Sequence, residues 1–217
     1  MSGPRLIVFD LDGTLIDSRR DLADAANALI AEHGGAPLPV DGIAGMVGEG
    51  AALLVRRALS AAGVRLDVAR DLPRFLELYD QRLLAHTTLY DGAREMLEAL
   101  EQKSALAVLT NKPQRHTDAI LVGLGIASAF RWIVGGDSAH GRKPDPAGLR
   151  YEMTSAAAVP SDTLMVGDSA IDLKTARAAG VRICLVRYGF GFRSTEGMLQ
   201  GDELIADSPS AIVRLAA

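Results

Sequence analysis

The sequence contains a single cysteine, Cys184, in 217 residues. A disulfide within the chain is therefore excluded, which fits a protein of the reducing cytoplasm. Long apolar runs are also missing. No stretch approaches the roughly 18 apolar residues of a membrane span, and the first residues carry no apolar segment of the signal-peptide kind. We therefore expect a cytoplasmic protein without a membrane partner, with Cys184 buried in a strand.

An excess of positive charge is lacking as well. The chain has 23 Lys and Arg against 27 Asp and Glu, a net charge of −4, so we expect no nucleic-acid partner. A small anionic ligand remains compatible, since a few local cations decide its binding. The four histidines show no metal-ligand spacing. The length suits one core of ordinary size with a modest insertion, and a monomer and a homodimer both stay open.

What the sequence does have is a short apolar run, Leu6-Ile7-Val8-Phe9, that leads directly into Asp10-Leu11-Asp12-Gly13-Thr14. The run predicts a buried parallel strand, and ligands bind outside the carboxyl ends of such strands. Residues i and i+2 of extended backbone project to the same side, so Asp10 and Asp12 can face one site. Two close carboxylates repel each other unless a cation such as Mg²⁺ joins them. The alternative interpretation is a turn that only caps a helix.

Apolar periodicity divides the rest of the chain into two parts. Residues from about 17 to 85 predict helices, with a loop at 37–42. Strands and helices then alternate, which indicates an α/β fold with a doubly wound parallel sheet. The predicted strands are 105–109, 132–134, 163–166, 182–186 and 204–205. We expect a Rossmann-like core of residues 1–16 and 86–217, with an inserted α-helical cap domain, 17–85, over its ligand end.

Polar residues follow the predicted strand 105–109. Thr110 offers a hydroxyl there, and Asn111 a backbone amide, which can bind a phosphate beside a helix start. Lys143 lies in a later loop, where Pro144 restricts its backbone and favours a fixed direction of the side chain. Taken singly, Thr110 would be interpreted as a helix cap and Lys143 as a solvated surface lysine.

The predicted strand 163–166 leads into another acid, Asp168. Asp172 lies one helical turn later and can share a face with it. A helix cap would explain Asp168 alone. It is, however, the third acid after Asp10 and Asp12 at the carboxyl end of a strand, so the pattern predicts one site at one sheet edge.

Four segments together resemble the motifs of the haloacid dehalogenase superfamily, in order and at suitable spacing: Asp10-Leu11-Asp12-Gly13-Thr14, Thr110-Asn111, Lys143-Pro144 and Gly167-Asp168-Ser169-Ala170-Ile171-Asp172. Within it, the chain is most similar to the phosphoglycolate phosphatases. Three segments carry this similarity: Val47-Gly48-Glu49-Gly50, Leu54-Val55-Arg56-Arg57-Ala58-Leu59 and Val186-Arg187-Tyr188-Gly189-Phe190. One departure is Leu89-Tyr90-Asp91-Gly92, where relatives often have Tyr-Pro-Gly; it affects a turn.

The resemblance implies a Mg²⁺-dependent phosphomonoester hydrolase that acts on 2-phosphoglycolate or a similar small phosphate ester. Asp10 would be the nucleophile that forms an aspartyl-phosphate, and Asp12 the acid and base. The Asp10 and Asp168 carboxylates and the Asp12 backbone carbonyl would hold Mg²⁺.

The same resemblance implies how the phosphate is bound. Thr110 and the Asn111 amide would contact phosphoryl oxygens, and Lys143 would offset the remaining negative charge. Asp172 would orient Lys143 or a metal-bound water.

Substrate choice is expected from the cap, at the loop Gly48-Glu49-Gly50. Its glycines allow a close approach of the backbone to a ligand, and the following helix start favours an anion. Arg56 and Arg57 could clamp a carboxylate, but we expect them to be solvated or structural. Glu49 would repel a carboxylate, so we expect it to face solvent or to pair with a cap cation.

Two alternatives stay open. A sugar-phosphate mutase of the β-phosphoglucomutase kind uses the same motifs and a similar cap. A phospho-acceptor signalling domain also uses an aspartate, Mg²⁺, a threonine and a lysine, although such domains lack a long cap. Dehalogenases and phosphonatases are disfavoured because relatives with those activities usually lack an acid at the position of Asp12.

Overall fold

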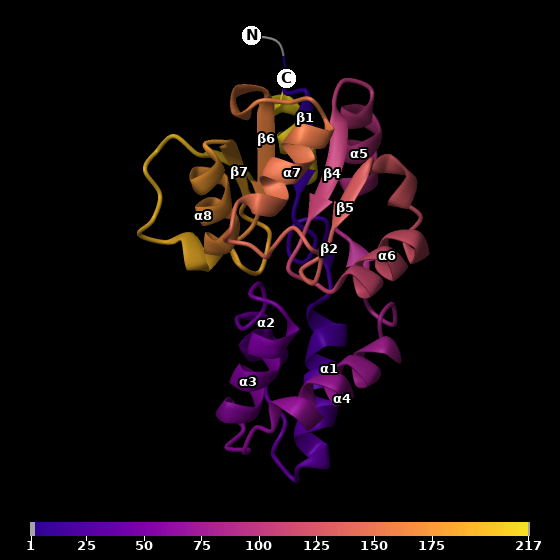
Figure 1. Cartoon of the computed structure of the whole chain (residues 1–217). Helices are drawn as coiled ribbons and strands as arrows, with labels where there is room; N and C mark the ends of the chain where they lie inside the picture. Colours follow the sequence, from indigo (N-terminus) through magenta and orange to yellow (C-terminus); the bar gives the residue numbers. More distant parts are fainter. Residues whose placement is uncertain (1–2, 217) are drawn as a thin grey trace.

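Six parallel strands form the central sheet of the computed structural model, which describes residues 3–216 (Figure 1). Its order is β5-β4-β1-β6-β7-β8. The strands are β1 (Leu6–Phe9), β4 (Ala105–Leu109), β5 (Trp132–Val134), β6 (Thr163–Gly167), β7 (Arg182–Val186) and β8 (Leu204–Ala206). Since β1 pairs with β4 on one side and β6 on the other, the residues that follow these three strands lie side by side.

Helices cover both faces of the sheet, as the alternating pattern predicts. Residues of β1 point alternately into two hydrophobic clusters, Ile7 and Phe9 into one and Leu6 and Val8 into the other. The first cluster is closed by α5 (Ala93–Glu101), α6 (Gln114–Gly123) and α9 (Pro209–Leu215), the second by α7 (Ala147–Ser155) and α8 (Ala170–Ala179). Short 3-10 helices occupy Ala127–Ala129, Pro160–Asp162 and Phe192–Thr195. The doubly wound sheet is confirmed, and Cys184 is buried in β7.

The helical insertion lies beyond the carboxyl end of the sheet (Figure 1). It comprises α1 (Arg19–Glu32), α2 (Val40–Ala44), α3 (Ala51–Ala61) and α4 (Val68–Asp80). These helices enclose a hydrophobic cluster of their own, which includes Leu29, Leu59 and Phe75. The short helix α2 falls partly in the segment predicted as a loop. Among residues 3–216, none of the helices combines the length and apolar character of a membrane span.

A two-stranded antiparallel ribbon joins the insertion to the sheet domain. It pairs β2 (Ile16–Asp17) with β3 (Thr88–Leu89), and the sequence pattern does not predict it. Two-residue strands carry no measurable periodicity, so only the tertiary contact reveals them. The ribbon lies where the chain enters and leaves the insertion.

Asp21 links the start of α1 to residues 86–87, where the chain leaves the insertion. Its carboxylate is fully buried and accepts hydrogen bonds from the backbone N–H groups of His86 and Thr87 and from the Thr87 hydroxyl, at 2.7–3.0 Å. We expect Asp21→Ala to lower the free energy of unfolding by about 3 kcal/mol or more, since it leaves buried donors unpaired. The control is Asp24→Ala, which removes an exposed pair with Arg20 and should cost less than about 1 kcal/mol in urea unfolding. Equal losses would contradict the anchoring role.

Candidate active site

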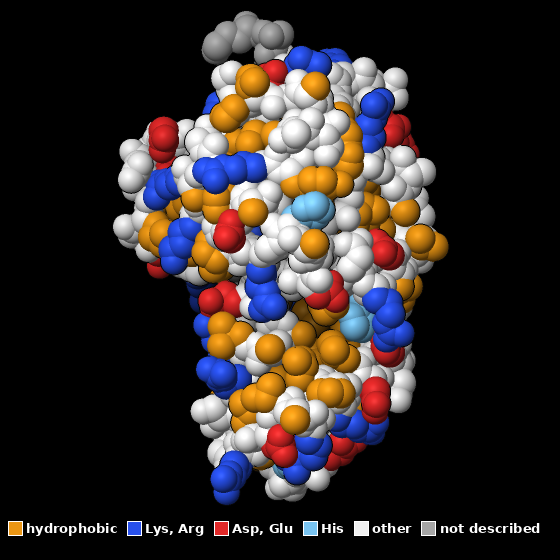
Figure 2. All heavy atoms as spheres, viewed as in Figure 1, with side chains coloured by type: hydrophobic (Ala, Val, Ile, Leu, Met, Phe, Trp, Pro, Cys, Tyr) orange, Lys and Arg blue, Asp and Glu red, His pale blue; other side chains and the backbone are white. Residues whose placement is uncertain are grey.

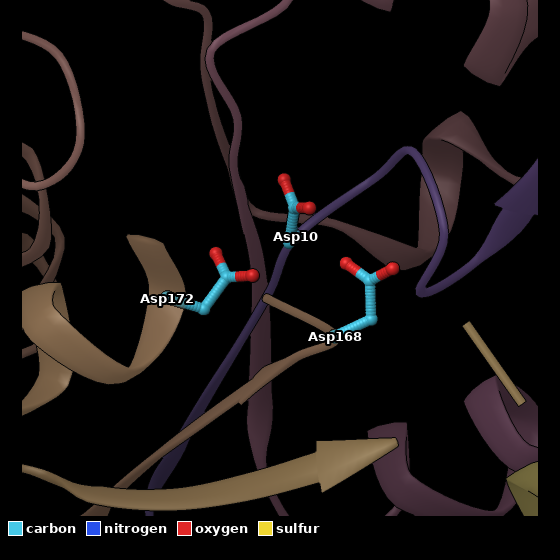
Figure 3. Close-up of side chains that lie close together, drawn as sticks. All are labelled: Asp10, Asp168 and Asp172. Atoms are coloured by element: carbon cyan, nitrogen blue, oxygen red, sulfur yellow. The ribbon is translucent and has the colours of Figure 1, made fainter. Parts of the chain in front are cut away.

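Three carboxylates converge at the carboxyl end of the sheet (Figure 3). Asp10 follows β1, Asp168 follows β6, and Asp172 lies in the first turn of α8. All three are buried, and each offers an oxygen within 4.8 Å of those of the others. The neighbouring positions of β1 and β6 bring Asp10 and Asp168 together across the sequence, as the strand-end argument predicts.

Lys143 is buried between two of these acids. Its Nζ donates to Asp10 Oδ1 at 2.6 Å and to Asp172 Oδ1 at 2.7 Å. The other oxygen of Asp172 accepts from the backbone N–H and hydroxyl of Ser169, the capping box that begins α8. Asp172 therefore fixes the position of Lys143 relative to Asp10 while its own carboxylate is held by the helix start.

The cluster holds more negative than positive charge. Burial raises the pKa of Asp10 to about 7, with Lys143 acting in the opposite direction. Burial also raises the pKa of Asp168 well above its usual value, and Asp172 and Asp10 add to this effect. Burial opposes the charge of Lys143, but the two adjacent carboxylates raise its pKa overall. One lysine thus does not balance three buried carboxyl groups, and an oxygen-preferring divalent cation fits the donor set.

Asp12 belongs to a different part of the site. Its carboxylate accepts from Lys112 Nζ at 2.9 and 3.0 Å and from Ser18 Oγ at 2.5 Å. The Asp12 side chain lies outside the three-acid group and lines the cleft beneath the helical insertion. The two acids of the first motif therefore have separate surroundings.

Thr110 and Asn111 lie at the end of β4, and both line the cleft. The Thr110 hydroxyl accepts from the backbone N–H of Lys112 at 3.2 Å. The Asn111 amide group donates to the carbonyls of Gly48 and Lys143, at 2.8 and 2.9 Å. The Asn111 side chain thus connects the loop before α3 to the loop that carries Lys143.

The loop Gly48-Glu49-Gly50 faces the sheet domain through its glycines. Gly48 and Gly50 line the cleft with φ values of 115° and 90°, a conformation that favours glycine. Glu49 instead pairs with Arg57, whose guanidinium also donates to the carbonyl of Met46. Arg56 is exposed. Neither arginine lines the cleft, so the carboxylate clamp considered from the sequence is not formed.

The cleft lies between the insertion and the sheet edge, where Figure 2 shows hydrophobic side chains gathered around the opening. The insertion contributes Leu22, Val47, Ala51, Leu54, Phe75, Leu76 and Tyr79. The opposite wall carries Asp10, Asp12 and the segment 110–113. The wall formed by the insertion is therefore mainly apolar and faces the acids.

Lys112 and Tyr79 are polar lining residues that the sequence analysis did not predict as part of the site. Lys112 is 6% exposed, and its Nζ stands 4.8 Å from the centre of the Tyr79 ring. Tyr79 falls on the apolar stripe of α4, which predicts a core residue. The position of Lys112 directly after Asn111 was the available signal, but its partner Asp12 lies 100 residues away.

Comparisons with known proteins agree with this arrangement. A family model described as haloacid dehalogenase-like hydrolase matches residues 7–186. The chain is 45% identical over 195 residues to the phosphoglycolate phosphatase of Rhodospirillum rubrum, covering 86% of this chain and 81% of that protein. It is 38% identical over 218 residues to that of Pseudomonas putida, covering 97% and 76%. The crystal structure of a predicted phosphoglycolate phosphatase from Haemophilus somnus superposes with a TM-score of 0.93 at 31% identity, covering all of both chains.

Proposed function

We propose that this chain, which belongs to the haloacid dehalogenase-like hydrolase family, is a phosphatase that hydrolyses a small phosphomonoester, with 2-phosphoglycolate as its preferred substrate. The observation that carries the proposal is the Asp10 carboxylate, which lines the cleft, is held by Lys143 and lies beside two further buried acids. The similarity to named phosphoglycolate phosphatases supports the choice of substrate.

Asp10 is the proposed nucleophile. One of its oxygens attacks phosphorus, a P–O bond forms to the carboxylate, and the P–O bond to the leaving alcohol breaks, which gives an aspartyl-phosphate. Lys143 reduces the repulsion between the carboxylate and the phosphate dianion. Thr110 and the backbone amide of Asn111 bind phosphoryl oxygens. Asp172 keeps Lys143 in place through its 2.7 Å contact.

Mg²⁺ is the proposed cofactor. The carboxylates of Asp10 and Asp168 and the backbone carbonyl of Asp12 are its proposed ligands, because the buried acids supply the oxygen donors that Mg²⁺ prefers. When bound, the ion supplies positive charge that lowers the repulsion between nucleophile and phosphate.

The helical insertion, residues 17–85, is the proposed cap. Its apolar wall faces Asp10 and Asp12, so closure of the cap removes water from the reacting groups. A dry cleft strengthens the contacts of the phosphate with Lys143 and favours transfer to Asp10. The β2–β3 ribbon is where we expect the cap to move relative to the sheet.

Asp12 is proposed to protonate the leaving oxygen and then to take a proton from the attacking water. We expect Asp12→Asn to lower kcat for an alkyl phosphate by about 10²–10⁴-fold, because an alkoxide leaves poorly without a proton. Turnover of p-nitrophenyl phosphate should fall much less, since nitrophenolate needs little protonation. Steady-state kinetics on both esters measure the difference. Equal losses would show that Asp12 does not act on the leaving group.

A panel of phosphate esters tests the substrate directly. With Mg²⁺ present, kcat/KM for 2-phosphoglycolate should exceed that for glucose phosphates and nucleoside monophosphates by at least about ten-fold, the range that a few polar contacts supply. If no ester of the panel stands out, the substrate assignment fails and the phosphatase assignment remains. Formation of an isomerised sugar phosphate with a bisphosphate activator would identify a mutase instead.

We also propose that the protein acts in the cytoplasm on a diffusible small molecule. The single thiol, Cys184, is buried and unpaired, which suits a reducing compartment. The net charge of −4 gives no support to a nucleic-acid partner.

A further inference from the structure

Lys112 and Tyr79 form a polar end of the cleft beside Asp12. Lys112 comes from the sheet domain and Tyr79 from α4, so both parts of the molecule contribute. Lys112 Nζ uses two directions for the oxygens of Asp12, at 2.9 and 3.0 Å, and stands 4.8 Å from the centre of the Tyr79 ring. An ammonium group has three N–H donors, so Lys112 can donate to one more acceptor.

The hydroxyl of Tyr79 has no hydrogen-bond partner within residues 3–216, although the residue is 2% exposed. A buried hydroxyl without a hydrogen-bond partner is unfavourable, and a ligand oxygen that accepts its hydrogen bond removes this penalty. Burial raises the pKa of Tyr79 to about 12, with the neighbouring Lys112 acting in the opposite direction, so the hydroxyl keeps its proton and is available as a donor. Two donors therefore lie at the same end of the cleft.

The other Lys and Arg side chains near the cleft are poorly placed to contact a ligand bound in it. In the described part of the chain, Lys112 is the one Lys or Arg that lines the cleft. Arg57 is bound to Glu49, and Arg56 is exposed. Arg142 lies at the edge, near Gly50, and is exposed.

We propose that Lys112 and the Tyr79 hydroxyl are the subsite that binds the carboxylate of the substrate, so that the protein selects phosphate esters whose alcohol carries an acid group. The proposal rests on the proposed function, because it names the leaving-group contacts of that same site.

The distances allow this contact. Asp12 must come within about 2.6–3.2 Å of the leaving oxygen, which puts Lys112 Nζ within about 6 Å of that oxygen. In 2-phosphoglycolate one methylene separates the ester oxygen from the carboxyl carbon. The carboxylate therefore fits between the leaving oxygen and Lys112, with Tyr79 as its second donor.

Tyr79→Phe is the cleanest variant, since it removes only an unpaired hydroxyl and should not unfold the protein. The substrates are 2-phosphoglycolate and 2-hydroxyethyl phosphate, which differ only in the acid group. We expect the ratio of their kcat/KM values to fall about ten-fold or more, as for the loss of a hydrogen bond to a charged group. Tyr90→Phe is the matched control, because its hydroxyl is also buried and unpaired but lies outside the cleft. It should leave the ratio unchanged.

Lys112→Met should lower the same ratio further than Tyr79→Phe, whereas Lys112→Arg should restore part of it. Equal losses on both esters would mean that Lys112 only holds Asp12, and the proposal would be overturned. A selective loss in Arg142→Met, with Tyr79→Phe unaffected, would place the carboxylate at the rim and also overturn it.

Binding separates this inference from the proposed function. Calorimetry on Asp10→Asn compares the Kd values of the two esters without turnover. Tighter binding of 2-phosphoglycolate that is lost in Asp10→Asn with Tyr79→Phe supports the subsite even if no ester is hydrolysed. Equal affinities overturn it even if the wild type is an active phosphatase.

Discussion

Asp10→Asn is expected to lower phosphate release by at least about 10⁴-fold, because an amide oxygen is a poor nucleophile and the reaction has no other route of comparable rate. The fold should persist, since asparagine has the same size and removes charge from a buried, acid-rich cluster. The measurement is phosphate release from p-nitrophenyl phosphate and 2-phosphoglycolate under saturating Mg²⁺.

Circular dichroism and thermal unfolding of the same variant provide the control, with mass spectrometry to exclude deamidation to Asp. Asp207→Asn is a matched change, because Asp207 is an exposed acid that pairs with Arg187. It should leave activity within about two-fold, as for a surface ion pair. Turnover of Asp10→Asn near the wild-type rate would remove Asp10 from the mechanism.

Asp168→Asn is expected to raise the Mg²⁺ concentration that gives half-maximal activity by at least about 100-fold, and to lower the rate at saturation. Chelation should abolish activity of the wild type, with recovery on addition of Mg²⁺. Ca²⁺ should inhibit, because its looser coordination misplaces nucleophile and phosphate. Full activity in excess chelator would contradict the metal assignment.

A second readout of the same variant is independent of activity. Burial and the nearby Asp172 and Asp10 raise the pKa of Asp168, so the metal-free cluster is strained electrostatically. Removal of this acid should therefore leave the free energy of unfolding in chelator equal to or above that of the wild type. Added Mg²⁺ should stabilise the wild type and have little effect on Asp168→Asn. A large loss of stability in chelator would show that Asp168 is mainly structural.

The sheet and the strand-end acids could be predicted because their signals are local. Continuous apolar runs such as Leu6–Phe9 occur where a strand is buried on both faces, and the residue after each run lies at the sheet edge. This logic predicts that Asp10 and Asp168 meet. Other parts depend on distant contacts. The β2–β3 ribbon pairs residues about seventy positions apart and contains two residues per strand.

The helical insertion shows the same limit in a different way. Apolar periodicity predicts its helices, but it does not say which members of the apolar stripe face the sheet domain. Tyr79 lies on that stripe and still reaches the cleft, where it meets Lys112. Arg57 has the charge to bind a carboxylate of a ligand, but its guanidinium is already paired with Glu49. The contact of Tyr79 with Lys112 follows from the packing of α4 against the sheet domain and is absent from any short window of sequence.

The stereochemical course at phosphorus tests whether Asp10 becomes phosphorylated, and it does not depend on how long an intermediate persists. The substrate is a phosphorothioate ester made chiral with oxygen isotopes, hydrolysed in isotopically labelled water. Two successive in-line displacements, first by Asp10 and then by water, each invert the phosphorus centre. We expect net retention of configuration in the thiophosphate product. Net inversion would mean that water attacks the ester directly and that Asp10 is not phosphorylated.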